Sequence, residues 1–459
     1  MYKSTRIYKM IDKVSSFLNE FKFEDIPKVA IDNSLRSFVD LIGVAASATQ
    51  TDLSKIIRKH CKNFYAPNPN QGISSSIWFD GSYVNVLGAT LANSMTIDSL
   101  DAHDGQKLTK GHVGCGLIPS IIACMEAEEN YCSKDFLRNL VIGYEIGTRA
   151  GISLHKSSKD YHTSGAWISI ACAGIVSKVL ELNKNQIREA FGIAEFYGPR
   201  SQMMRCIDYP TMVKDGSGWG AMSGVNAAYL AKEGFSGSPA ITVEDESLSY
   251  IWSDLGSKWY TNEQYLKLYP VCRWAQPALE ACLYLKRKHN IDVNNIESIT
   301  INTFHEAKRL DNKYPENTEQ AQYSLPYPVA IALIFERLSA QEVSEKFFKN
   351  KEVINLTEKI LVCESDKYNK AFPKNRYADA VIKLKNGNEF KSKPTEAKGD
   401  PENPLLMRDI KNKFEDLTFN LLGKDRSERL FKKIIELDYS SDFKEVLELI
   451  IGSVDKKSF

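Results

Sequence analysis

The 459-residue sequence lacks the features that mark several classes of protein. Its nine cysteines are irregularly spaced and include no Cys-x-x-Cys pair, which argues against a zinc ribbon, a thioredoxin motif and a disulfide framework. No apolar run of about 18 residues is free of charge, so we expect no membrane-spanning helix. The formal net charge is only +1, whereas nucleic-acid and membrane-surface binders usually carry a basic excess. These absences favour a small-molecule enzyme in a reducing, cytoplasmic setting.

The N-terminal segment also lacks the continuous apolar region of a signal peptide. Its apolar residues recur instead at helical spacing, which predicts an amphipathic helix. Helical patterns continue over 27–49, 134–150, 165–182 and 217–234, and the last two are rich in Gly, Ala and Ser. Small residues let helices approach closely, so these two segments are expected inside a helical core.

The pattern changes near residue 290. Residues 296–304 alternate apolar and polar, which predicts a strand, and 378–393 predict a hairpin around Asn386-Gly387. Residues 327–347 are again helical, 394–404 are rich in Pro, Gly and Asp, and 406–451 return to amphipathic helices. We therefore predict a mainly α protein with an α+β insertion. The large helical domain would comprise 1–265 and 400–459, with a smaller α+β lid at 266–399.

Seven histidines are present, and histidine is the side chain that most readily exchanges protons near pH 7. His60, His289 and His305 lie in polar settings and are expected at the surface. His103 and His112 share a segment with Asp98, Asp101 and Asp104 and with four glycines. A catalytic loop that pairs carboxylate with imidazole is one interpretation. A solvated capping loop is another, and a metal site using Asp101, His103 and Asp104 is a third, disfavoured because the spacing matches no standard zinc pattern.

Three further clusters combine polar and small residues. His162 precedes the apolar segment 165–182, where it could face a pocket or lie beside a helix cap. Lys214 stands among glycines before another helix, where it could hold an anion or lie at the surface. Cys272 is next to Arg273 in Lys267-Leu-Tyr-Pro-Val-Cys-Arg-Trp-Ala-Gln276. A buried inert thiol is the favoured interpretation of Cys272, and an activated thiolate is the alternative.

These segments together resemble the MmgE/PrpD family, which includes 2-methylcitrate dehydratases, cis-aconitate decarboxylases and iminodisuccinate epimerases. Eight motifs occur in the family's order over roughly 25–420. They are Phe38-Val-Asp-Leu-Ile-Gly43, Leu100-Asp-Ala-His-Asp-Gly105 with Gly111-His112, Gly143-Tyr-Glu-Ile-Gly-Thr-Arg149, Tyr161-His-Thr163, Lys214 with the helix through Gly234-Phe-Ser-Gly237, Lys267-Leu-Tyr-Pro-Val-Cys272, Ser324-Leu-Pro-Tyr-Pro-Val-Ala330 and Gly399-Asp-Pro-Glu-Asn-Pro404.

The resemblance implies a helical domain with an α+β lid, a homodimer, and catalysis that uses neither metal nor organic cofactor. It places a pocket between the two domains. In that pocket the implied acid–base pair is Asp101 and His112, with Lys214 and Lys267 as carboxylate ligands. The other implied pocket residues are His162 and Tyr327 as proton donors or carboxylate anchors, and His103, Asp104, Cys272, Arg273 and Gln276 as substrate contacts.

The sequence departs from the family pattern at four positions. His103 stands within a loop that is usually Asp-rich, and Asp215 follows Lys214 where basic residues are frequent. Gln276 replaces a usual histidine, and Cys272 stands where decarboxylases carry histidine. We therefore expect a lyase, most simply a 2-methylcitrate dehydratase-like enzyme, acting on a substrate with fewer carboxylates than citrate. A decarboxylase, an epimerase, a biosynthetic tailoring enzyme and a non-catalytic dimeric binding protein are the alternatives.

Overall fold

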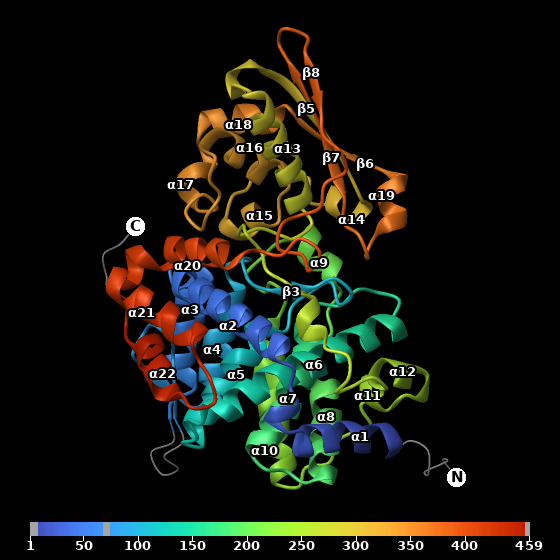
Figure 1. The fold of residues 1–459 in the computed structure, drawn as a ribbon, viewed down its shortest axis with the longest axis vertical. Coiled ribbons are helices and arrows are strands. Elements are labelled where there is room, and N and C mark those ends of the chain that lie inside the picture. Colours follow the sequence, from blue (N-terminus) through green and yellow to red (C-terminus); the bar gives the residue numbers. More distant parts are fainter. Residues whose placement is uncertain (1–7, 68–73, 455–459) are drawn as a thin grey trace.

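A computed structural model describes residues 8–67 and 74–454 of the chain. Two lobes are stacked along the long axis (Figure 1). The lower lobe is helical, and the upper lobe combines a small sheet with helices. The fold class predicted from the sequence, mainly α with an α+β insertion, is confirmed, while the exact division at 265 and 399 stays a prediction. In the described part of the chain, no helix combines the length and apolarity needed to span a membrane.

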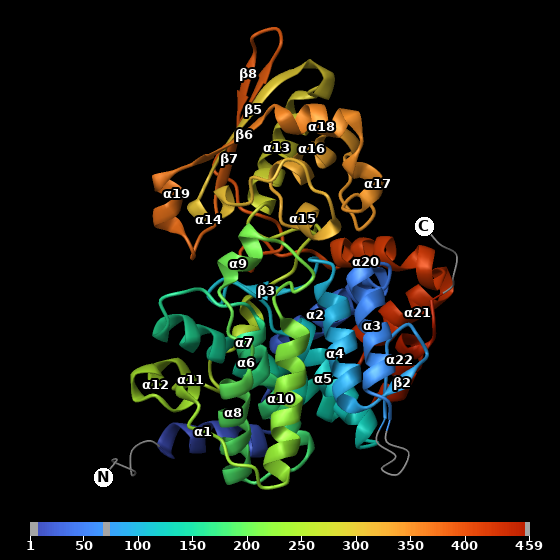
Figure 2. The same ribbon diagram turned by 180° about the vertical axis from the view of Figure 1, so that it is seen from behind.

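The lower lobe is a bundle of helices. Three of them, at residues 86–98, 114–127 and 165–179, are almost fully buried at its centre. Its elements are α1 (Tyr8–Glu20), α2 (Lys28–Ala48), α3 (Asp52–Phe64), α4 (Val86–Asp98), α5 (Gly114–Ala127), α6 (Ser133–Ser157), α7 (Gly165–Val179), α8 (Lys184–Tyr197), α9 (Met203–Asp208), α10 (Ser217–Lys232), α11 (Ile241–Glu244) and α12 (Ser249–Trp252). Helices α7 and α10 run side by side (Figure 2). A Cβ at Gly224 would lie 2.2 Å from the Ser169 carbonyl oxygen, so this close packing requires glycine.

The upper lobe is built on a four-stranded sheet of order β6-β5-β7-β8. Its elements are α13 (Gln276–His289), β5 (Ile296–Thr303), α14 (His305–Lys308), α15 (Thr318–Gln322), α16 (Pro326–Phe335), α17 (Glu345–Phe348), α18 (Lys351–Glu358), β6 (Ile360–Glu364), α19 (Asp366–Ala371), β7 (Ala378–Leu384) and β8 (Glu389–Lys391). Strands β5 and β6 are parallel, and the other pairs are antiparallel. The hairpin at Asn386-Gly387 is present, with Gly387 at a φ of 87°.

One expected helix is shorter in the structure. The segment 327–347 contains α16, which ends at Phe335, because Glu336 adopts a left-handed conformation with φ 53°. Only the four-residue α17 follows within that segment. A left-handed residue releases the chain from the helix, and the apolar spacing beyond it reflects packing of an irregular segment.

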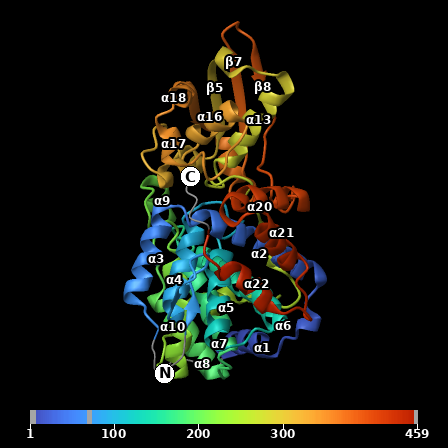
Figure 3. The same ribbon diagram turned by 90° about the vertical axis from the view of Figure 1, so that its left-hand side faces the viewer.

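The chain returns to the lower lobe through α20 (Met407–Leu422), α21 (Lys424–Ile435) and α22 (Phe443–Ile451). Helices α20 and α21 pack against α2, and Figure 3 shows these C-terminal helices beside the N-terminal ones. The two chain crossings between the lobes lie next to each other, since the backbone N–H of Leu266 donates to the Gly399 carbonyl at 3.0 Å.

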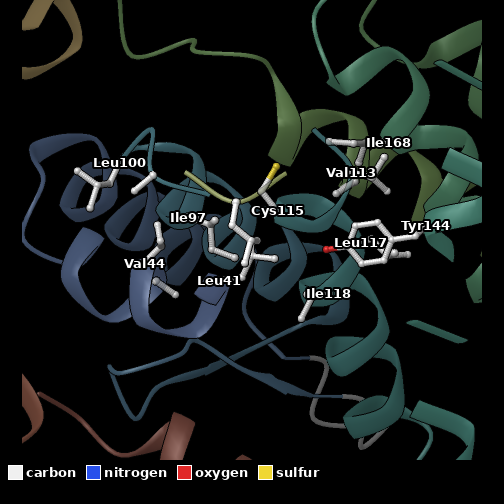
Figure 4. Close-up of a cluster of buried hydrophobic side chains, with 14 of the residues drawn as sticks. Leu41, Val44, Ile97, Leu100, Val113, Cys115, Leu117, Ile118, Tyr144 and Ile168 are labelled. Atoms are coloured by element: carbon white, nitrogen blue, oxygen red, sulfur yellow. The ribbon is translucent and has the colours of Figure 1, made fainter. Parts of the chain in front are cut away.

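The loop between α4 and α5 is anchored at both ends in the hydrophobic core. Leu100 and Val113 are 1% and 0% exposed, and they lie among buried side chains of α2, α4 and α5 (Figure 4). Burial of apolar surface holds each end in place. The residues between them, 101–112, are therefore held on a fixed frame at the junction of the lobes.

Candidate active site

A small cavity lies at the junction of the two lobes. Its volume is ≈ 20 Å³, which is less than a small-molecule ligand needs. A substrate therefore needs more room at this junction than the structure provides. The lining residues are Asp101, Lys110, His112, Met203, Ile207, Asp215, Tyr265, Lys267, Cys272, Arg273, Trp274 and Tyr323.

His112 is held as a neutral base. Its Nδ1 donates a hydrogen bond to the backbone carbonyl of Asp104, which leaves the Nε2 lone pair unprotonated. Burial, aided by the neighbouring His103 and Lys267, lowers the pKa of His112 to about 3. The Nε2 atom lies 3.6 Å from Asp215 Oδ2 and 4.0 Å from Asp101 Oδ1. The Nε2 atom of His112 is therefore free of a proton at neutral pH and is oriented so that it could accept one from a bound substrate.

Asp101 and Lys267 form a buried ion pair across the lobes. The ammonium group also donates to the Asp101 carbonyl at 3.2 Å. Although burial opposes the charged form, Lys267 and Lys214 hold the pKa of Asp101 below its usual range. Burial also opposes the charge of Lys267, but Asp101 raises its pKa above the usual value. Both groups are therefore charged at neutral pH.

Lys214 is buried and bonded to the upper lobe. The residue has a left-handed φ of 47°, and its Nζ donates to Gln322 Oε1 at 2.7 Å. The same oxygen accepts the backbone N–H of Asp101 at 2.8 Å. The ammonium group also lies 4.6 Å from the centre of the Tyr323 ring, a favourable cation–π geometry.

Two further carboxyl groups stand close to these cations. Asp215 Oδ2 accepts a hydrogen bond from Ser164 Oγ at 2.7 Å, and Asp98 Oδ2 accepts the backbone N–H of Ser217 at 3.3 Å. Burial raises the pKa of both carboxyl groups. Each can therefore hold a proton more readily than an exposed aspartate.

His103 lies behind His112 and does not line the cavity. The two rings are 4.3 Å apart at their centres, and His103 Nε2 is 3.6 Å from Asp98 Oδ1. Neither ring nitrogen has a hydrogen-bond partner within the described residues. Burial, with a contribution from Lys267, lowers the pKa of His103 to about 3. The imidazole is therefore a neutral neighbour of His112.

Asp101, His103 and His112 are close enough to offer one ligand atom each to a metal ion, with all three atoms within 4.8 Å of one another. Their surroundings do not fit a cation. Lys267 is already paired with Asp101, and Lys214 is held by Gln322, which also binds the Asp101 backbone. A divalent ion would face two ammonium groups at short range. Cofactor-free chemistry stays our prediction.

Arg273 and Cys272 line the cavity at the start of the upper lobe. Arg273 pairs with Asp400 at 2.5 Å and donates to Gln276 Oε1 at 3.0 Å. Asp400 belongs to the second crossing, so this pair ties the two crossings together. Burial raises the pKa of Cys272 to about 12, which leaves the thiol protonated and a poor nucleophile.

Besides His103 and Lys214, four more of the predicted site residues do not line the cavity. His162 is half-buried, and its Nδ1 contacts the Asp160 carbonyl at 3.0 Å. The Tyr327 hydroxyl donates to the Glu342 carbonyl inside the upper lobe at 3.0 Å. Gln276 donates to the carbonyls of Tyr269 and Val271. Asp104 accepts a hydrogen bond from Tyr144 at 2.6 Å. Each of these four side chains is therefore held by a hydrogen bond to a protein group outside the cavity.

Sequence reasoning missed several residues at the cavity. Tyr323 lies one residue before the Ser324-Leu-Pro-Tyr motif, and Gln322 precedes it. Both sit in polar stretches without periodicity, so only their closeness to that motif could have signalled them. Lys110 lies in the same loop as His112, and burial lowers its pKa to about 8. Tyr265 lies two residues before Lys267, and only that closeness could have signalled it.

Comparisons with known proteins agree with this architecture. The sequence profile of the MmgE/PrpD N-terminal domain matches residues 12–256, and that of the MmgE/PrpD C-terminal domain matches residues 269–437. The cis-aconitate decarboxylase-like protein oryM of Aspergillus oryzae is 22% identical over 96% of this chain and 97% of its own length.

Two further relatives are named as a decarboxylase and as a dehydratase. Cis-aconitate decarboxylase of Mus musculus is 22% identical over 96% of this chain and 93% of its own length. The mitochondrial 2-methylcitrate dehydratase of Yarrowia lipolytica is 26% identical over 55% of this chain and 52% of its own length. Both profiles, matched in order across the two lobes, lead to one conclusion: the chain belongs to the MmgE/PrpD family.

Proposed function

We propose that the protein is a lyase that acts on carbon next to a carboxylate in a small hydroxy acid, most simply as a dehydratase. One observation carries the proposal. A neutral His112, oriented by the Asp104 carbonyl, faces a cavity that also holds the charged pair Asp101–Lys267. A base beside fixed cations is what removal of an α-proton requires.

The proposed reaction uses these groups in order. His112 Nε2 takes the proton from carbon, and the electron pair left behind spreads into the adjacent carboxylate. Lys267 and Lys214 stabilise that developing charge. The carbon–oxygen bond at the neighbouring carbon then breaks, and the hydroxyl group leaves as water after taking a proton from Asp215 or Tyr323. The products are an alkene and water. The proton held by His112 then returns, through solvent as the products leave, to the group that protonated the hydroxyl, so both groups regain their starting state.

The charges around the cavity favour a substrate with fewer carboxylates than citrate. Lys267 is neutralised by Asp101, and Arg273 by Asp400. Asp215 adds a further carboxyl group to the lining. A tricarboxylate would bring three negative charges close to Asp215, at a cost of several kcal/mol in a site of low dielectric.

Two other outcomes pass through a similar carbanion. The relatives named as cis-aconitate decarboxylases favour loss of carbon dioxide, which generates the carbanion in place of proton removal and requires a later protonation of carbon. Return of an abstracted proton to the opposite face would give epimerisation. A biosynthetic intermediate is one possible source of the substrate. A non-catalytic dimeric binding protein is the alternative from another class, and the orientation of His112 speaks against it.

A substrate panel tests the proposal. Purified protein is incubated with 2-methylcitrate, citrate, cis-aconitate and simpler 2- and 3-hydroxy acids. Alkene formation is followed by ultraviolet absorbance, carbon dioxide by trapping, and α-proton exchange by NMR in heavy water. The proposal predicts a signal that disappears in the His112→Asn variant. Absence of all three signals across the panel contradicts it.

We also propose that the protein is a cytoplasmic homodimer. Support for a dimer comes from the exposed aromatic side chains of segment 196–219, where Phe196, Tyr209 and Trp219 are 71%, 76% and 45% exposed. Exposed aromatic side chains are enriched at protein–protein contacts. Light scattering gives the mass in solution, and a monomer would contradict the proposal.

A further inference from the structure

A second pocket lies between the lobes, separate from the catalytic cavity and much larger. Its volume is ≈ 550 Å³, within the range of small-molecule sites. Gln50 and Thr51 line it from the turn between α2 and α3, Asp52 lines it from the start of α3, and residues of α15 and α17 line it from the upper lobe. In Figures 1 and 2 these elements face each other where the lobes meet.

Glu319 brings an unpaired carboxylate oxygen to this pocket. The residue lines the pocket and is only 3% exposed, yet its Oε1 has no hydrogen-bond partner within the described residues. Leaving a buried carboxylate oxygen unpaired is costly, because the group has lost water and gained nothing in return. A ligand that donates hydrogen bonds would satisfy the carboxyl group once its side chain turns toward the pocket.

The charges of the lining indicate which donor fits. Three carboxylates (Asp52, Glu319 and Glu345) and two lysines (Lys55 and Lys346) line the pocket. Lys55 is already paired with Asp52 at 3.1 Å. The carboxylates therefore outnumber the ammonium groups. A primary ammonium both neutralises a carboxylate and donates up to three hydrogen bonds.

The pocket is connected to the catalytic site by a short chain of hydrogen bonds. Thr318 lines the pocket, and its Oγ1 accepts the Nε2 of Gln322 at 2.9 Å. The Oε1 of the same glutamine accepts Lys214 Nζ and the backbone N–H of Asp101. Ligand contact at Thr318 and Glu319 therefore acts on the amide that positions two predicted catalytic residues.

From these observations we propose that the interlobe pocket is a second ligand site. It binds a small organic molecule bearing a primary ammonium group, held by Glu319. Its occupancy is transmitted to Lys214 and Asp101 through Thr318 and Gln322. The ligand contacts both lobes at once. It therefore stabilises the arrangement in which the two lobes stand at the distance that allows these contacts.

Titration calorimetry of the full chain with 1,4-diaminobutane tests the site without reference to catalysis. We expect saturable binding of the diamine and none of 1,4-butanediol, which has the same length but no ammonium group. Glu319→Gln keeps the shape, removes the charge and should weaken binding about tenfold or more. Glu316→Gln, an exposed carboxylate outside the lining, is the matched control and should bind normally.

Hydrogen–deuterium exchange measured on the same samples tests the connection. Diamine should slow exchange of the Asp101 amide, and Gln322→Ala should abolish that protection while leaving diamine binding intact. Absence of saturable diamine binding, equal binding of the diol, or normal binding by Glu319→Gln would overturn the ligand site. Binding without any change at Asp101 would overturn the transmission.

Discussion

Lys214 of the lower lobe and Gln322 of the upper lobe are joined by a buried hydrogen bond of 2.7 Å. The glutamine oxygen also holds the backbone N–H of Asp101, and its Nε2 donates to the Ser99 carbonyl at 3.1 Å. One upper-lobe side chain thus fixes both the lysine and the loop that carries the proposed acid–base pair. The geometry of the site therefore depends on contact between the two lobes.

Gln322→Ala should disturb this junction. The buried ammonium of Lys214 loses an acceptor, which typically costs about 2 kcal/mol when the group is charged. We expect a lower free energy of unfolding in urea and a reduced kcat/KM for whichever hydroxy acid is turned over. Gln320→Ala, two residues earlier in α15 and not bonded to Lys214, is the control. Equal stability and activity in both variants would show that the Gln322 contact is unimportant.

Asp215→Asn should widen tolerance for highly charged substrates. The change removes a carboxyl group from the cavity lining while keeping its shape. We expect binding of citrate to tighten about tenfold at pH 8, where a carboxyl of raised pKa is more fully ionised in the parent protein. Calorimetric titration measures it, with the exposed Asp32→Asn as a control. Unchanged citrate affinity would remove Asp215 as a determinant of substrate charge.

His103 should make stability depend on pH in a defined direction. Its pKa is about 3 in the folded protein, where burial opposes the charge, and 6.5 is the ordinary value. Between these values the unfolded chain binds a proton that the folded chain does not. The free energy of unfolding therefore falls as pH drops from about 6.5 toward 3.

His103→Asn removes that proton and should flatten the dependence by up to about 1.4 kcal/mol per pH unit. Urea denaturation at pH 4.5, 5.5 and 7 measures the slopes. His289→Asn changes an exposed histidine and should leave the slope as it was. A His103→Asn slope equal to that of the parent protein would mean that His103 is not buried in its neutral form.

Local patterns predicted most of the fold because each lobe is dominated by periodic elements. The apolar helices α7 and α10 and the hairpin of β7 and β8 are visible in the spacing of their own residues. The end of α16 was not predictable in this way. It depends on the left-handed Glu336, whose sequence neighbourhood contains no glycine or asparagine to signal it.

The site was predictable only where it lies within one segment. His112 and Asp101 share a glycine-rich loop, so composition pointed to them. Gln322 and Tyr323 reach the same place from more than 200 residues away, and no local pattern records that contact. Tyr327 shares a motif with them, yet its hydroxyl is bonded within the upper lobe. Which tyrosine faces the cavity is decided by tertiary packing.

The most direct test of the account is the turnover of a hydroxy-acid substrate by His112→Asn. Asparagine retains a polar side chain near the Asp104 carbonyl but has no basic nitrogen. General acid–base catalysis by His112 predicts a fall in kcat of a hundredfold or more with KM changed only a few-fold, in a protein that unfolds at the parent temperature. Turnover within a few-fold of the parent protein would contradict the assignment of His112 as the base.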